Sequence, residues 1–274
     1  PSMVGAYAPE SERVTQLSTG LRALYPTYSP DGNWIAFVRN EGGSNNLGFL
    51  WHDGSVIVMV PGGKDFTELY TPSWSPDGTK LALSRSHKGQ RDIVYFDLNR
   101  ERLDSLGSKL IQTQSVTGSE PITHIDSAIV RSVETIVATK GTDRDPVWSH
   151  DGTEIIFASD SSGIFNVYAF NDGSKEKRLI TNVSGGAVSP TVNVDGTIAF
   201  ASYGVDGFRL RTIKESTPTQ LSATQVAIPT PDSPRQIASS EVGPSQGSDA
   251  TVELVKAVEP SSLNTGLLAV SEKI

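Results

Sequence analysis

Two stretches of the sequence contain the residue types of a serine hydrolase site. Gly243–Gly247 (Gly-Pro-Ser-Gln-Gly) matches the nucleophile-elbow pattern. That elbow needs a hydrophobic strand before the serine and a helix after it, whereas this one lies in a Pro/Ser-rich segment. The second stretch, Ser149-His150-Asp151, holds the three residue types of a triad, but adjacent residues in one turn cannot adopt triad geometry. We therefore predict no catalytic residue and interpret the chain as non-enzymatic.

Metal-binding patterns are equally incomplete. His52, His87 and His124 have no short spacing of the kind that binds zinc. The loops at Asp143–Asp145 and Asp160–Gly163 offer carboxylates but do not fit the twelve-residue calcium loop. The chain has no cysteine, which excludes disulfides, thiolate metal ligands and a cysteine nucleophile. We predict no metal ion and no cofactor.

The most prominent feature of the sequence is a repeated motif and not a set of catalytic residues. Tyr25–Phe37 reads Tyr-Pro-Thr-Tyr-Ser-Pro-Asp-Gly-Asn-Trp-Ile-Ala-Phe, and close copies occupy Thr71–Leu83 and Asp145–Phe157. A fourth copy, Ser189–Phe200, has Asn193-Val194 in place of Ser-Pro and is one residue shorter. Pro26 and Pro72 are 46 residues apart, and Pro146 and Pro190 are 44 apart. A period near 45 with several short strands is typical of a propeller blade.

Each copy predicts a β-hairpin. Ser29-Pro30-Asp31-Gly32 suits a type I turn in which the final glycine adopts a positive φ. Because the acidic residue and the glycine recur at equivalent places, we interpret them as turn-forming rather than catalytic. These structural turn residues are Asp31, Gly32, Asp77, Gly78, Asp151, Gly152, Asp195 and Gly196.

The strand after each turn is apolar on both faces. Ile35 and Phe37 alternate with Ala36, and the other copies repeat this arrangement. A sheet with one solvent-exposed face would be polar at every second position. We therefore expect each sheet to lie between two others, with Tyr28, Trp74 and Trp148 packed between sheets.

The pattern Pro-x-aromatic-Ser-Pro-Asp-Gly followed by Ile-Ala-Phe resembles the TolB-type propeller repeat, a relative of the WD repeat. The resemblance covers roughly residues 12–222, except an unmatched insertion at about 104–140. It implies an all-β propeller of four-stranded antiparallel blades, located in the bacterial periplasm or envelope and used for docking onto other proteins. It does not imply one activity, because such propellers also occur as non-catalytic parts of peptidases. We predict five or six blades in all.

The insertion and the chain ends depart from the repeat. We predict an edge hairpin, rather than a helix, from the Ile/Val/Thr-rich stretches 110–116 and 128–138. Residues 1–20 either complete a blade begun near the C-terminus or continue sequence that lies upstream; ring closure removes exposed strand edges and is favoured. We expect the propeller over residues 1–225. A Pro/Ser-rich segment with late strands over 226–274 then closes the ring or forms a partner-binding arm.

Charge and hydropathy limit the partners. The net charge of −8, from 23 basic and 31 acidic residues, argues against nucleic acid, whose binders present a basic face. No apolar run approaches the ~20 residues of a membrane-spanning helix. No signal peptide is visible, so we expect that an export signal has been removed or lies outside this chain. Arg144 and Asp145, in a loop near one mouth of the ring, are candidate partner contacts.

The leading hypothesis is a non-catalytic scaffold or accessory subunit of a bacterial envelope or membrane-associated complex. One alternative is the propeller domain of a larger peptidase or hydrolase, which a hydrolase elbow in sequence beyond either terminus would establish. Another is a propeller that binds a small ligand or glycan in its central channel.

Overall fold

A computed structural model describes residues 3–9, 12–41, 44–61, 68–117, 121–214 and 268–272. The chain divides into two units, residues 1–214 with 262–274 and residues 215–261, and the second lies wholly outside the described residues. The predicted boundary at 225, the Gly243–Gly247 pattern and the predicted strand at 251–258 also lie outside them.

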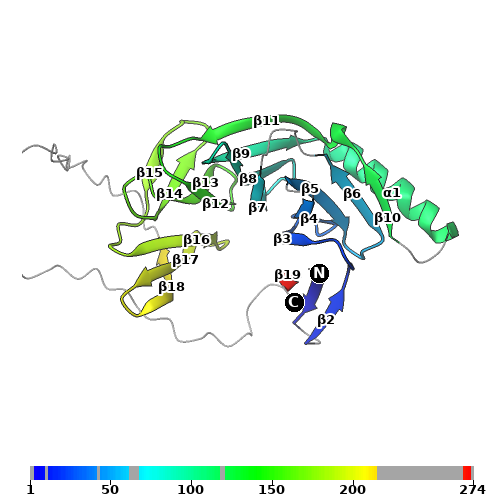
Figure 1. Cartoon of the computed structure of the whole chain (residues 1–274), viewed down its shortest axis with the longest axis horizontal. Helices are drawn as coiled ribbons and strands as arrows, with labels where there is room; N and C mark the ends of the chain where they lie inside the picture. Colours follow the sequence, from blue (N-terminus) through cyan, green and yellow to red (C-terminus); the bar gives the residue numbers. More distant parts are fainter. Residues whose placement is uncertain are drawn as a thin grey trace, which may run out of the picture. The chain divides into compact units, whose positions relative to one another are not determined.

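The described residues of the first unit form five sheets, whose strands are mostly antiparallel (Figure 1). The first contains β1 (Met3–Ala8), β2 (Arg13–Gln16) and β19 (Leu268–Glu272). The second contains β3 (Ala23–Tyr28), β4 (Trp34–Glu41), β5 (Ser44–Trp51), β6 (Val56–Val60) and β10 (Ile122–Ile125). The third contains β7 (Glu68–Trp74), β8 (Lys80–His87), β9 (Gln90–Leu98) and β11 (Val130–Val137). The fourth contains β12 (Asp143–Trp148), β13 (Glu154–Ser159), β14 (Asn166–Asn171) and β15 (Lys177–Leu179), and the fifth β16 (Gly186–Val192), β17 (Thr197–Gly204) and β18 (Gly207–Lys214).

The repeated hairpins have the predicted turn. The Gly32 amide donates to the Ser29 carbonyl at 2.9 Å, and Gly32 has a φ of 73°. The Ser29 hydroxyl donates to Asp31 at 2.5 Å and accepts from the Trp34 amide at 3.0 Å. These side-chain bonds hold the turn against the strand that follows it. The second and third copies repeat them, and in the fourth Asn193 takes the place of the serine at the turn carbonyl.

Both faces of the central strands are buried, as predicted. Ile35 and Phe37 of β4 belong to the hydrophobic cluster that includes Val4 of β1, whereas Ala36 faces the cluster shared with β8. The third and fourth sheets alternate in the same way, so each cluster lies between two successive sheets, whereas the fifth sheet contributes to one cluster only. Trp74 is 7% exposed and packs in one of these clusters, which confirms its predicted position between sheets.

The chain ends meet within the first sheet. β1 pairs antiparallel with β2 on one side and with β19 on the other, with Gly5 opposite Val270. The strands predicted near residues 3–7 and 13–17 are confirmed by β1 and β2. Ring closure and the number of blades stay predictions.

The insertion is not the predicted edge hairpin. Residues 110–116 belong to a helix, α1 (Arg100–Thr117), and only the second stretch forms a strand, β11. Asn99 begins the helix, because its side chain accepts from the Arg102 amide at 3.2 Å. Leu103 is fully buried, and three further side chains with helical spacing pack beside it against the core of the second and third sheets. These three are Leu106, Leu110 and Ile111.

Arg100 of helix α1 contacts the first repeated turn and the end of the strand before the second. The Arg100 guanidinium pairs with Asp31 of the first turn at 2.5 Å and with Asp104, one helical turn later, at 3.0 Å. It also lies 5.6 Å from the centre of the Trp74 ring, at the end of the strand before the second turn. After the helix, β10 adds to the second sheet parallel to β6, and a short 3-10 helix (Ser127–Ile129) leads into β11.

The contact of α1 with the second sheet predicts the effect of Gly107→Ala. A Cβ atom on buried Gly107 would lie 2.6 Å from Cζ2 of Trp34. The indole cannot retreat easily, since Trp34 is fully buried and its Nε1 donates to Asp104 at 2.9 Å. Alanine favours a helix over glycine by up to about 1 kcal/mol, whereas overpacking costs about 1–3 kcal/mol. We expect a net destabilisation of about 1–2 kcal/mol, measured by denaturant unfolding.

Ser108→Ala is the matched control, because Ser108 is the exposed neighbour of Gly107 on the same helix. This variant should change the free energy of unfolding by less than about 0.5 kcal/mol. A Gly107→Ala variant as stable as the wild type would show that α1 does not pack against Trp34 as described.

Candidate functional site at the first strands of the sheets

The first strands of four successive sheets, β3, β7, β12 and β16, lie next to one another (Figure 1). Trp74 of β7 donates its indole N–H to the carbonyl of Thr27 in β3 at 3.1 Å. On β16, the Ser189 hydroxyl donates to the carboxylate of Asp145 in β12 at 3.1 Å. Bonds of this kind join separate sheets and fix the relative positions of their first strands.

An unusual backbone conformation recurs in these four strands. In each, the residue before the repeat's proline has a positive φ of 45–55°, and the pairing with the second strand shifts register at that point. A non-glycine residue in this region is strained by roughly 1–2 kcal/mol and requires support from its surroundings. At β12 the Asp145 amide donates to the Ser84 hydroxyl of the third sheet at 3.2 Å. The residues are Tyr25, Thr71, Asp145 and Ser189.

A pocket of about 430 Å³ opens where the first strands reach their turns. We name it the first-strand pocket. Each of the four repeats contributes two residues at equivalent positions. One lies in the first strand, directly after the repeat's proline, and the other is the second residue of the turn. The former are Thr27, Ser73, Val147 and Thr191, and the latter Pro30, Pro76, His150 and Val194. Trp74, Trp148, Ser149 and Val192 complete the lining.

The pocket presents hydroxyl and apolar groups rather than an acid–base pair. The Ser149 hydroxyl donates to Asp151 at 2.6 Å, and Asp151 also accepts from the amide and hydroxyl of Thr153. The consecutive Ser149-His150-Asp151 is therefore a turn and not a triad. Among the described residues, no three histidine, aspartate or glutamate side chains are grouped so that they could hold a metal ion.

The turn carboxylates are held in their ionised form. A hydrogen bond from Ser149, followed by the Thr153 amide, lowers the pKa of Asp151. The Thr197 amide and hydroxyl lower the pKa of Asp195 to about 2. Burial opposes the shift at Asp31 and Asp77, but the hydrogen bonds of each turn outweigh it and lower both pKa values. These residues support the turns, which agrees with their interpretation as structural.

Arg144 and Asp145 form an ion pair of 3.0 Å outside the lining of the first-strand pocket. Asp145 is 8% exposed and also accepts from Ser189, so little of its carboxylate faces solvent. The Arg144 side chain is 36% exposed, and its guanidinium lies 5.8 Å from the ring centre of Phe165. Of the two predicted contacts, Arg144 has the more accessible side chain, and its role stays a prediction.

Sequence reasoning missed the residues that line the pocket. They occupy the position between proline and the aromatic residue, where Thr27, Ser73 and Thr191 carry a hydroxyl but Val147 does not, so the position is not part of the repeat's fixed pattern. A superposition of the four repeats would have placed them together, because the first strand of a blade contributes the same position each time.

No protein-family model matches the chain. It is similar to a protein named TolB homolog from Chlorobium luteolum, at 24% identity over 180 residues, covering 60% of this chain and 39% of the relative. A protein of the same name from Chlorobium chlorochromatii is 28% identical over 190 residues, which are 69% of this chain and 34% of the relative. Among solved structures, TolB from Acinetobacter baumannii has a TM-score of 0.57 at 18% identity, covering 78% of this chain and 50% of that one.

The chain resembles TolB-type β-propellers in sequence and in fold.

The resemblance and the fold class predicted from the repeats are thereby confirmed. The chain spans less than two fifths of the length of the curated relatives it matches. Its fold is also similar to that of puromycin hydrolase, with a TM-score of 0.51 at 14% identity, covering 75% of this chain and 32% of the hydrolase.

The lowered pKa of Asp151 predicts a pH-dependent effect of Asp151→Asn. A carboxylate with a lowered folded-state pKa stabilises the fold above its unfolded pKa of about 3.9. That stabilisation is lost as the pH falls through the folded value. The wild type should therefore be more stable than the variant by less than about 1 kcal/mol at pH 7, since the turn is exposed. The difference should shrink below about pH 4, as measured by denaturant unfolding at several pH values.

Asp206→Asn serves as the control, since Asp206 is an exposed carboxylate whose described bond is an ion pair with Arg209. It should reproduce the wild-type pH dependence. A difference between wild type and Asp151→Asn that does not vary with pH would contradict the assigned role of the turn carboxylate.

Proposed function

We propose that this chain is a non-catalytic protein-docking module, a scaffold or accessory subunit of a bacterial envelope or membrane-associated complex. The observation that carries the proposal is the first-strand pocket. It is built from four rigidly joined strands and lined by hydroxyl and apolar side chains without an acid–base pair. Rigid frames with such concave surfaces suit recognition of a partner's side chains.

The lining of the pocket indicates the kind of surface that would dock there. Pro30, Pro76 and Val194 provide apolar groups at the turns, and Thr27 and Thr191 provide hydroxyls beside them. A partner loop with an apolar side chain and exposed backbone polar groups would match both features. We propose Arg144 as an additional contact, because part of its guanidinium is accessible.

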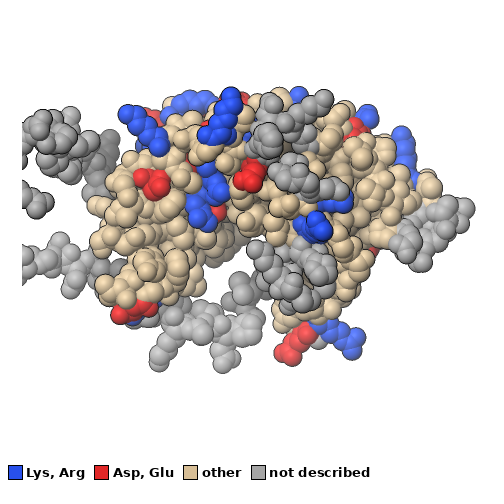
Figure 2. Space-filling model, viewed as in Figure 1, with Lys and Arg blue, Asp and Glu red and all other residues tan. Residues whose placement is uncertain are grey.

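The distribution of charge is consistent with a protein partner. On the face shown in Figure 2, basic and acidic side chains of the described residues are interspersed among uncharged ones. A nucleic-acid interface would instead need a continuous basic surface, and the net charge is −8. We propose that the protein is located outside the cytoplasm, and its resemblance to TolB-type propellers supports this. No helix among the described residues is long and apolar enough to cross a membrane.

A second candidate is the propeller domain of a larger hydrolase. The fold similarity to puromycin hydrolase and the partial coverage of the longer relatives favour it. It requires a catalytic domain beyond the described residues, with a nucleophile elbow between a strand and a helix. The intact mass of the natural polypeptide distinguishes the two, since the docking module needs no such domain.

The docking proposal predicts that Thr191→Arg prevents partner binding. Thr191 is exposed and lines the first-strand pocket, so a long charged side chain there would obstruct the pocket without entering the core. Tagged wild type and variant are purified gently from the native source, and co-purifying proteins are quantified by mass spectrometry. We expect the stoichiometric partner of the wild type to fall at least about tenfold with Thr191→Arg.

Thr212→Arg is the matched control. Thr212 is an exposed threonine of the same sheet, two strands away in register with Thr191, and it does not line the pocket. This variant should retain the partner. Equal recovery with Thr191→Arg and wild type would show that docking does not use the first-strand pocket.

A further inference from the structure

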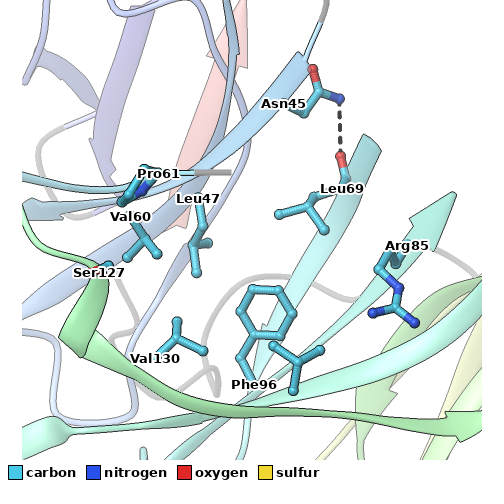
Figure 3. A pocket seen from close by; sticks show the side chains of 10 residues that line it. Asn45, Leu47, Val60, Pro61, Leu69, Arg85, Phe96, Ser127 and Val130 are labelled. Atoms are coloured by element: carbon cyan, nitrogen blue, oxygen red, sulfur yellow. Dashed lines mark hydrogen bonds between the residues drawn. The ribbon is translucent and has the colours of Figure 1, made fainter. Parts of the chain in front are cut away.

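A second pocket, of about 330 Å³, lies between the second and third sheets (Figure 3). We name it the intersheet pocket. It shares no lining residue with the first-strand pocket. Most of its wall is apolar and comes from β5, β6, β7, β9 and β11. The principal apolar side chains are Leu47, Val60, Leu69, Phe96, Val130 and Val133.

The pocket is an open cleft at the edge of the core between these two sheets. Leu47, Val60, Leu69 and Phe96 belong to the same hydrophobic cluster as Leu103 of α1, which packs into another part of it. In Figure 3 the Phe96 ring lies between Val130 and the pair of Leu47 and Leu69. Ligand sites are typically concave and mostly apolar with a few polar groups, so a cleft of this volume and lining is a candidate ligand site.

Two polar side chains define the rim. Asn45 is 6% exposed, and its amide donates to the Leu69 carbonyl at 3.2 Å, so this bond joins the two sheets (Figure 3). Arg85 lies elsewhere on the wall, half-buried, with one guanidinium nitrogen bonded to the Thr135 hydroxyl at 2.9 Å.

Arg85 forms no ion pair with any acidic side chain of the described residues. Asp92, its cross-strand neighbour on β9, instead accepts from Gln90 at 3.2 Å. A guanidinium has five N–H donors, of which the bond to Thr135 uses one. Donors therefore remain for an anionic group, and a carboxylate matches the planar guanidinium in a bidentate pair.

We propose that the intersheet pocket binds a small monocarboxylate with a compact apolar body, whose carboxylate pairs with Arg85. The volume of 330 Å³ is at the small end of ligand pockets and corresponds to about eleven water volumes of ~30 Å³. It therefore fits a ligand of roughly ten non-hydrogen atoms. The aliphatic wall and Phe96 accommodate the apolar body. This site is independent of the proposed docking function, with which it shares no residue.

The test uses octanoate as the probe, titrated into the full chain by isothermal titration calorimetry. 1-Octanol, which keeps the alkyl chain but lacks the charge, and butyrate, which keeps the charge but lacks most of the chain, are the comparison probes. We expect octanoate to bind at least about tenfold more tightly than either. No saturable octanoate binding up to about 10 mM would overturn the proposal.

Variants test the contribution of the Arg85 charge and that of the pocket volume separately. Arg85→Gln should weaken octanoate about tenfold and leave octanol unchanged, whereas Asp92→Asn should strengthen octanoate a few-fold by removing a neighbouring negative charge. Val133→Trp fills the pocket from a residue that is 46% exposed and should abolish binding of both probes without disturbing the core. Arg209→Gln, an exposed arginine of the fifth sheet, is the control and should match the wild type.

Two outcomes would overturn the assignment. Octanol as tight as octanoate, with no effect of Arg85→Gln, would show that Arg85 recognises no anion. Octanoate binding that persists in Val133→Trp would show that the ligand occupies another place. Circular dichroism and unfolding midpoints of each variant exclude misfolding as the cause of lost binding.

Discussion

The second, third and fourth sheets of this protein are each buried by apolar contacts on both faces, and this constraint determines the rest of the structure. Ile35 and Phe37 must be covered from one side and Ala36 and Val38 from the other, so no sheet can be stable alone. Successive sheets satisfy the constraint by stacking, and the repeats supply matching faces. The four repeated turns place the second strand of each sheet in the register that this stacking requires, and serine–aspartate bonds stabilise three of them.

Stacking brings the first strands together and so creates the candidate docking site. The same stacking leaves room between the second and third sheets, where α1 packs into one part of the core and the intersheet pocket occupies another. The stacking of the sheets therefore makes the frame rigid and also forms the two candidate binding pockets. The strained residues before the prolines, such as Asp145, are tolerated because bonds such as that to Ser84 of the neighbouring sheet hold them.

The repeated hairpins could be predicted from sequence because their turns and strands depend on neighbouring residues. Helix α1 and strand β10 were harder to predict because they depend on contacts with distant parts of the chain. Ser-Pro-Asp-Gly encodes its own turn, and alternation at Ile35–Phe37 encodes a two-sided strand, so both followed from sequence alone. Helix α1 did not, because Ile111, Thr113 and Val116 suggested a strand over 110–116, and the helical spacing becomes evident only when the apolar residues before that stretch, from Leu103 on, are included. The parallel addition of β10 also depends on a distant segment. The pocket residues lie outside the fixed pattern of the repeat, so their shared position in the blade identifies them.

Amide hydrogen exchange on the isolated complex can show whether the first strands and their turns form the docking surface. Exchange is compared for the protein with and without its co-purified partner. We expect the partner to slow amide exchange at the ends of the four first strands and in their turns, which are 27–34, 73–80, 147–154 and 191–197. Exchange in β11 and β18 should be unchanged. Protection confined to β11, β18 or the outer edge of the second sheet, with no change at the repeated turns, would contradict the docking proposal.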